Sequence, residues 1–77
     1  MIIKFYTQGC APCKAIDSIL TQMDVSFHEV DISQDIDKAI EFKVKSVPTL
    51  LNTESGERLV GFKSISHTEG WIHDNRD

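Results

Sequence analysis

The fold of this chain is decided by residues 1–23, MIIKFYTQGCAPCKAIDSILTQM. Residues 1–6 are rich in isoleucine and aromatic side chains, which predicts a strand buried on both faces apart from Lys4. After a short turn, apolar residues recur at helical spacing to the end of the stretch and predict an amphipathic helix. Cys10 and Cys13, the only two cysteines of the chain, lie where the strand gives way to the helix.

The middle of the chain predicts a second strand and a short second helix. Apolar and polar residues alternate over residues 25–30, as they do in a half-buried strand. Asp31 or Ser33 is expected to cap the helix that follows. The apolar positions expected on the inner face of this helix are Ile36, Ala39, Ile40 and Val44.

The last part of the chain predicts a hairpin and a final helix. Strands over residues 49–51 and 57–60 are separated by turn-forming residues. Residues 66–69, Ser-His-Thr-Glu, form a capping box for the final helix. The element order is then βαβαββα, an α/β fold with a four-stranded mixed sheet flanked by three helices. Helical crossovers favour parallel pairing of the first two strands. We expect one domain over residues 1–77.

Composition restricts the classes of function. The chain has 77 residues, of which 40% are hydrophobic, enough for one compact core. Its net charge of −4 argues against nucleic acid or an anionic membrane as the main partner. Two cysteines are too few for a disulfide-rich secreted scaffold, and neither a signal peptide nor a membrane-spanning run is recognisable. We therefore expect a cytoplasmic monomer.

The pair Cys10 and Cys13 indicates redox chemistry. If Cys10 caps the helix, Pro12 occupies the first turn, where its missing N–H costs nothing. The Cys13 N–H then points back at the Cys10 sulfur, and the helix N-terminus stabilises a thiolate there. Cys10 is thus expected to have the lower pKa and the greater exposure. It would attack a substrate disulfide, and Cys13 would resolve the mixed disulfide.

A metal site is the alternative interpretation of the cysteine pair. A structural zinc site needs four ligands. The remaining candidates, His28, His67 and His73, are scattered over three predicted elements, so we expect no metal. An iron–sulfur carrier that uses Cys10 with an external thiol is a further alternative, which Pro12 and a resolving cysteine disfavour.

A second signal is Val47-Pro48-Thr49, immediately before a buried strand. Proline is rare there because it removes a ladder donor. An X-Pro bond is cis in only about 5–6% of cases in folded proteins, so the general expectation is trans. A cis bond would instead turn the chain beside Cys10 and leave the Val47 backbone able to pair with a substrate strand.

In the cysteine pair and the proline segment together, the chain resembles the thioredoxin superfamily. Residues 10–14, Cys-Ala-Pro-Cys-Lys, look like the family's active site, with Ala11 in place of the usual glycine. Residues 46–51 and the turn around Gly56 look like its cis-proline segment and hairpin. The resemblance covers nearly the whole chain. It implies that Pro48 is cis and that Cys10 is the nucleophile.

The chain departs from full-length thioredoxins in three respects. It begins directly at the first core strand, and Gly9 stands where they usually carry tryptophan. Lys4 stands about where they carry a buried aspartate that handles protons for the resolving cysteine. That role has no obvious bearer in this sequence, so water or another group must take the proton.

The segment 61–64, Gly-Phe-Lys-Ser, indicates which molecule reduces the cysteine pair. Glutathione-using glutaredoxins typically have paired glycines and then acidic residues here. This segment is closer to that of glutaredoxin-like redoxins that supply electrons to ribonucleotide reductase and are recharged by thioredoxin reductase. The resemblance therefore implies a minimal thioredoxin or such a redoxin, with a glutathione-dependent glutaredoxin as the alternative. We expect no cofactor beyond the redox-active disulfide. The residues expected to bind the substrate are Ala11, Pro12, Val47, Pro48, Gly61 and Phe62.

Overall fold

The computed structural model describes residues 1–76 and has the predicted βαβαββα order. The elements are β1 (Ile2–Tyr6), α1 (Ala11–Gln22), β2 (Phe27–Asp31), α2 (Ile36–Glu41), β3 (Thr49–Asn52), β4 (Arg58–Val60) and α3 (Ile65–Asn75). The four strands form one sheet in the order β2-β1-β3-β4. β1 and β2 pair parallel, whereas β3 is antiparallel to both β1 and β4. The predicted mixed sheet is therefore confirmed.

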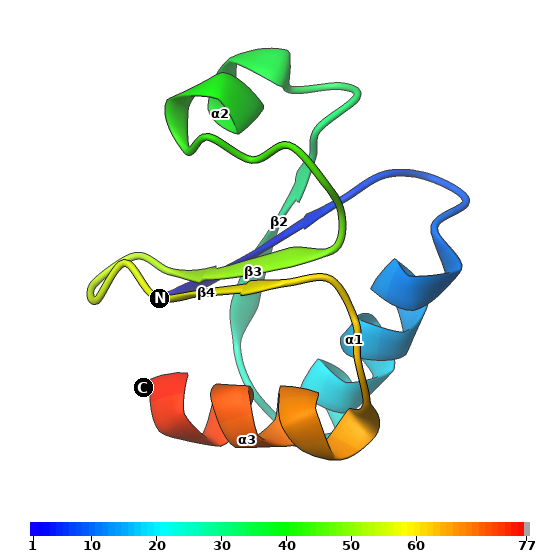
Figure 1. Ribbon diagram of the computed structural model, residues 1–77, viewed down its shortest axis with the longest axis vertical. Coiled ribbons are helices and arrows are strands. Elements are labelled where there is room, and N and C mark those ends of the chain that lie inside the picture. The colour runs from blue at the N-terminus through cyan, green and yellow to red at the C-terminus, as the bar shows by residue number, and fades with distance from the viewer. Residues whose placement is uncertain (77) are drawn as a thin grey trace.

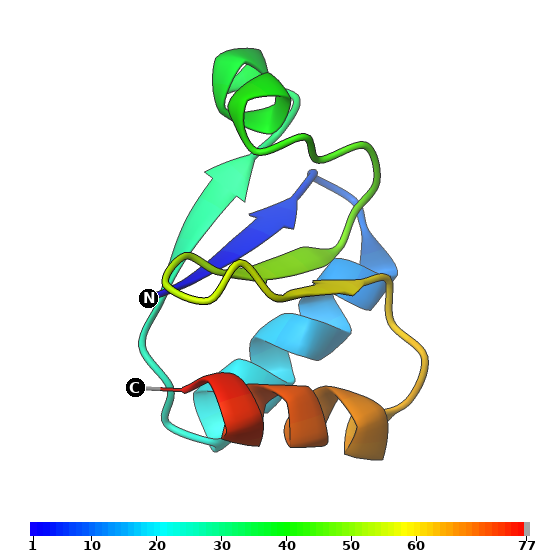
Figure 2. The same cartoon turned by 60° about the vertical axis from the view of Figure 1, so that its left-hand side comes forward.

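The sheet separates two apolar clusters. Helices α1 and α3 cover one face and α2 lies toward the other, as Figure 1 and Figure 2 show. The larger cluster, on the side of α1 and α3, consists of Ile2, Ile16, Ile19, Leu20, Leu50, Leu59 and Ile72. The smaller cluster consists of Ile3, Phe5, Val44 and Leu51. Because side chains alternate along a strand, Lys4 points to the same side as Ile2, toward α1.

The second helix differs from the prediction. Helix α2 spans only six residues, and its N-cap is Asp35 rather than Asp31 or Ser33. Ile36 and Ile40, expected on the inner face, are 60% and 69% exposed, whereas Ala39 is buried. The helix is too short to bury a full apolar stripe. The segment that follows it packs on the smaller cluster instead, with the Phe42 ring centroid 5.8 Å from that of Phe5.

The final helix begins earlier than predicted. Its N-cap is Ser64, whose Oγ accepts a hydrogen bond from the His67 N–H at 3.1 Å, so the capping box over residues 66–69 is wrong. The Ser64 carbonyl also accepts the first helical bond, from the Thr68 N–H at 3.1 Å, so the helix is complete one turn before Thr68. Thr68 and Ile72 are fully buried, and the Thr68 hydroxyl donates to the Ser64 carbonyl at 2.9 Å. This contact joins the buried face of α3 to the capping residue.

The strand register places the ends of β1 and β4 beside the start of β3, at one end of the sheet. Thr49, the first residue of β3, pairs with Phe5 near the end of β1 and with Val60 at the end of β4. Three connecting segments therefore lie together at this edge, which is formed by strand ends: the turn after β1, the segment before β3 and the segment after β4. In Figure 1 this edge faces the start of α1. The two sequence motifs are thus brought to the same end of the molecule.

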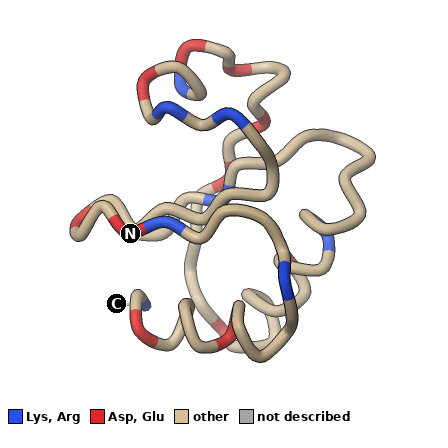
Figure 3. Tube along the Cα trace, in the orientation of Figure 1, with Lys and Arg blue, Asp and Glu red and all other residues tan. Residues whose placement is uncertain are grey.

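The distribution of charge and the length of the helices complete the description of the fold. Figure 3 shows the basic positions spread over several elements, with no continuous stripe along the described chain. Within residues 1–76, no helix has the length and apolarity that crossing a membrane requires.

Candidate active site

Cys10 caps helix α1 with its own side chain. Its backbone is extended, with φ −90° and ψ 103°, and its Sγ accepts a hydrogen bond from the Cys13 N–H at 3.2 Å. The Cys10 carbonyl accepts the first helical bond, from the Lys14 N–H at 3.2 Å. Pro12 lies in the first turn, where a missing N–H is tolerated. The local geometry is the one predicted from the spacing of the two cysteines.

Cys10 and Cys13 form a disulfide, with their Cα atoms 5.2 Å apart. Cys10 is partly exposed, whereas Cys13 is only 3% exposed. The predicted difference in exposure is therefore confirmed. Cys10 is therefore the cysteine of the pair that lies nearer the surface.

The proline segment adopts the geometry that the resemblance implies. The Val47–Pro48 peptide bond is cis, against the general expectation for X-Pro bonds. The Thr49 hydroxyl donates to the Ser46 carbonyl at 2.8 Å and closes the turn. The Gly61 N–H donates to the Pro48 carbonyl at 2.8 Å, with Gly61 at φ +81°, a backbone conformation that favours glycine. Pro48 and Gly61, far apart in sequence, are thereby joined.

The other residues expected to bind substrate lie in different surroundings. Ala11 and Pro12 are exposed beside the disulfide. Val47 is half-buried against the smaller apolar cluster, and Phe62 is half-buried against the larger one. Phe62 thus contributes packing to the core as well as lying next to Gly61.

Lys4 is the main feature that the sequence did not reveal. The sequence predicts that Lys4 is the one residue of this strand that is not buried, yet it is only 4% exposed. Its Nζ lies 3.0 Å from the Asp17 carboxylate in α1 and 3.0 Å from the Glu29 carboxylate in β2. The same atom lies 5.0 Å from the ring centroid of Tyr6 and 5.4 Å from that of Phe27. A charged residue in the centre of an apolar strand was the signal that partners had to exist.

A small pocket lies against the disulfide. It is lined by Lys4, Tyr6, Thr7, Gln8, Gly9, Cys10, Cys13 and Lys14. The buried lysine and both cysteines therefore face one space. The Trp-to-Gly replacement noted in the sequence falls in this lining, at Gly9, whose φ is +75°.

The histidines and acidic residues outside this pocket have other surroundings. His28, His67 and His73 are exposed. Among residues 1–76, no three His, Cys, Asp or Glu side chains gather as a metal site would require. The hydroxyl of Ser33, which donates to the Asp31 carboxylate at 2.6 Å, holds the pKa of Asp31 below its ordinary value.

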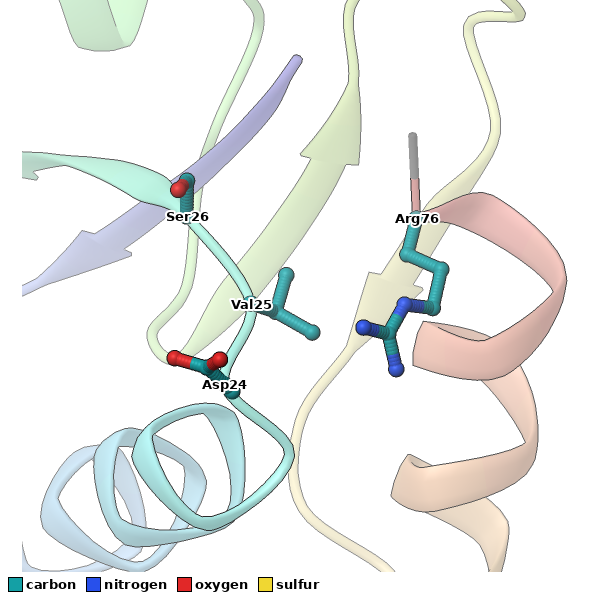
Figure 4. Close-up of a pocket in the computed structure, with 4 residues that line it drawn as sticks. All are labelled: Asp24, Val25, Ser26 and Arg76. Carbon is teal, nitrogen blue, oxygen red and sulfur yellow. The ribbon is translucent and has the colours of Figure 1, made fainter.

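A second hollow lies at the far end of α1. Figure 4 shows its lining, which consists of Asp24, Val25, Ser26 and Arg76. Since α1 follows Cys10 and ends before Asp24, the whole helix separates this hollow from the cysteines. It holds none of the residues predicted to act in catalysis.

An accessible sulfur at a helix N-terminus, paired with a buried one on this fold, defines a thiol–disulfide oxidoreductase. A sequence model described as Thioredoxin matches residues 1–73. The chain therefore belongs to the thioredoxin family, as its two motifs indicated.

Individual relatives agree with this assignment. The chain is 39% identical over 66 residues to the SPbeta prophage-derived thioredoxin-like protein YosR of Bacillus subtilis, covering 80% of this chain and 82% of YosR. It is 32% identical over 81 residues to mitochondrial thioredoxin of Mus musculus, covering 94% of this chain. The match spans only about half of that mouse protein, 49% of its length.

The solved structures show the same fold. The oxidised form of mitochondrial thioredoxin 3 from Saccharomyces cerevisiae matches with a TM-score of 0.77 at 30% identity. That match covers 95% of this chain and 76% of the yeast chain. Thioredoxin NaTrxh from Nicotiana alata matches with a TM-score of 0.77 at 32% identity, covering 99% of this chain and 72% of the plant chain.

Proposed function

We propose that this chain reduces protein disulfides by dithiol–disulfide exchange, with Cys10 as nucleophile and Cys13 as resolving thiol. The observation that carries the proposal is the hydrogen bond from the Cys13 N–H to the Cys10 sulfur at the start of α1. After reduction, the same N–H and the positive end of the helix stabilise a thiolate at Cys10. Cys10 is also the more exposed of the two sulfurs.

The reaction proceeds in two exchanges. The Cys10 thiolate attacks one sulfur of the substrate disulfide, and the other substrate sulfur leaves as a thiolate and takes up a proton. Cys13 then loses its proton and attacks the Cys10 sulfur. The Cys10–Cys13 bond forms, and the second substrate sulfur leaves and is protonated. The substrate gains two electrons and the cysteine pair loses two, which leaves the disulfide seen in the structure.

The segment around Pro48 would hold the substrate backbone next to Cys10. No hydrogen bond within residues 1–76 uses the backbone of Val47. An extended substrate segment could therefore pair with Val47 as an added strand does. Ala11, Pro12, Gly61 and Phe62 would form the surrounding contact surface. This arrangement favours an unfolded or loop segment of a protein over a small thiol as the substrate.

The reductant we propose is a flavoenzyme of the thioredoxin reductase type, with ribonucleotide reductase as the leading candidate substrate. Support comes from Lys63 and Ser64, which stand where a glutathione-binding glutaredoxin would carry acidic residues. We further propose a cytoplasmic monomer with no cofactor beyond the cysteine pair, because reducing compartments keep such a pair available for catalysis.

The test compares two reducing systems. Oxidised protein is mixed with NADPH and thioredoxin reductase, or with glutathione, glutathione reductase and NADPH, and NADPH oxidation is followed. Fast reduction by the first system alone is the expected result. Fast reduction by glutathione would instead assign the protein to the glutathione-dependent class and refute the proposed reductant.

Variants test the roles of the cysteines in the same assay with a protein disulfide as acceptor. Cys10→Ser should abolish turnover, whereas Ser18→Ala, an exposed change on α1, should leave it unchanged. Full activity of Cys10→Ser would exclude the proposed mechanism.

A further inference from the structure

The buried Lys4 ammonium lies on the side of α1 that carries Cys13. Asp17 follows Cys13 by four residues, so the two side chains are neighbours on one face of the helix. Lys4 Nζ is 3.0 Å from the Asp17 carboxylate, and Lys4 and Cys13 line the same pocket. Lys4 and the resolving cysteine therefore border the same space, and Asp17 connects the ammonium to the helix that carries Cys13.

The charged and titratable residues around Lys4 and Cys13 come from three elements. Lys4 and Tyr6 lie on β1, Asp17 and Lys14 on α1, and Glu29 on β2. The Asp17 and Glu29 side chains are each 46% exposed, so water screens much of their charge, whereas the Lys4 side chain is only 5% exposed. A buried charge acts more strongly on its neighbours than an exposed one.

We propose that Lys4 is a positioning residue that stabilises the thiolate of Cys13 for the resolving step. This inference rests on the dithiol–disulfide exchange proposed above. Ion pairs with Asp17 and Glu29 hold the Lys4 ammonium in place, and the proton that Cys13 releases passes to solvent. The Cys13 thiolate then attacks the Cys10 sulfur, and the departing substrate thiolate takes a proton from solvent.

The sign of the effect can be derived without knowing the net charge of the cluster. Removal of the positive charge makes the surroundings of Cys13 more negative and disfavours its thiolate. Removal of the negative charge of Asp17 acts in the opposite direction. A pair of variants with opposite expected shifts therefore separates an electrostatic role of Lys4 from a merely structural one.

The experiment measures the thiolate absorbance of Cys13 against pH in reduced Cys10→Ser protein, where Cys13 is the only thiol. In that background, Lys4→Met should raise the titration midpoint by about one unit, a roughly tenfold loss of thiolate at neutral pH. Lys4→Arg should retain most of the effect, because it keeps the charge. Lys38→Met, the matched control, removes an exposed lysine on α2 and should not move the midpoint.

If Lys4→Met does not fold, the test is the change from Asp17→Asn to the double variant Lys4→Met with Asp17→Asn. This change should raise the Cys13 midpoint, because only the Lys4 charge differs between the two proteins. An unchanged midpoint in folded Lys4→Met, or between those two proteins, would overturn the role given to Lys4. Neither result would affect the exchange mechanism, which instead depends on the turnover of the Cys10→Ser and Ser18→Ala proteins.

Discussion

The pairing of Lys4 predicts that its two carboxylates can substitute for each other in stabilising the fold. Asp17→Asn leaves Glu29 at 3.0 Å from the ammonium, and Glu29→Gln leaves Asp17 at 3.0 Å. Both carboxylates are about half exposed, so each single change should cost about 1 kcal/mol or less. The double change leaves a buried ammonium without a counter-charge and should cost about 3–5 kcal/mol. The expected loss is thus strongly non-additive.

Urea unfolding of the oxidised proteins measures this prediction by linear extrapolation of the free energy of unfolding. Adding Lys4→Met to the double variant should recover most of the lost stability, because it removes the stranded charge. The double variant could instead lose only the sum of the two single losses in free energy of unfolding, within about 0.5 kcal/mol. In that case the ammonium does not depend on these carboxylates, and the reasoning is refuted.

Three further predictions concern the core, a cap and a titration. Ile72→Ala should destabilise the protein by about 2–5 kcal/mol in urea unfolding, since Ile72 is fully buried, and a loss below 1 kcal/mol would contradict its place in the core. Ser64→Ala should cost about 1 kcal/mol and Ser66→Ala almost nothing, because Ser64 is the N-cap of α3; equal losses would restore the capping box predicted from sequence. Ser33→Ala should raise the pKa of Asp31 toward its ordinary value in an NMR titration. The folded pKa is depressed, so this carboxylate stabilises the fold above its ordinary pKa and the stabilisation is lost as pH falls; an unmoved Asp31 titration would exclude the role of Ser33.

The sequence was sufficient to predict the element order and the cysteine geometry. Strand, turn and helix patterns are local, and the hydrogen bond between Cys13 and Cys10 follows from a spacing of three residues at a helix N-terminus. The motif around Pro48 gave the cis bond only through the family resemblance, because local preference alone favours trans.

What the sequence did not reveal depended on contacts between distant residues. The burial of Lys4 requires carboxylates from α1 and β2, which meet only in the fold. Ile36 has the spacing of a core residue, yet it is 60% exposed because α2 is short and the following segment packs on the sheet. The early start of α3 follows from capping by Ser64 in place of Ser66, a difference of two residues that the sequence pattern did not show.

The central claim is that Cys10 alone attacks the substrate and that Cys13 alone releases it. The most direct measurement is intact mass spectrometry of reduced Cys13→Ser and Cys10→Ser proteins after brief mixing with a protein disulfide substrate. The account predicts a stable mixed disulfide on Cys10 in the Cys13→Ser protein and little or none on Cys13 in the Cys10→Ser protein. An adduct that forms equally fast on Cys13 would contradict it.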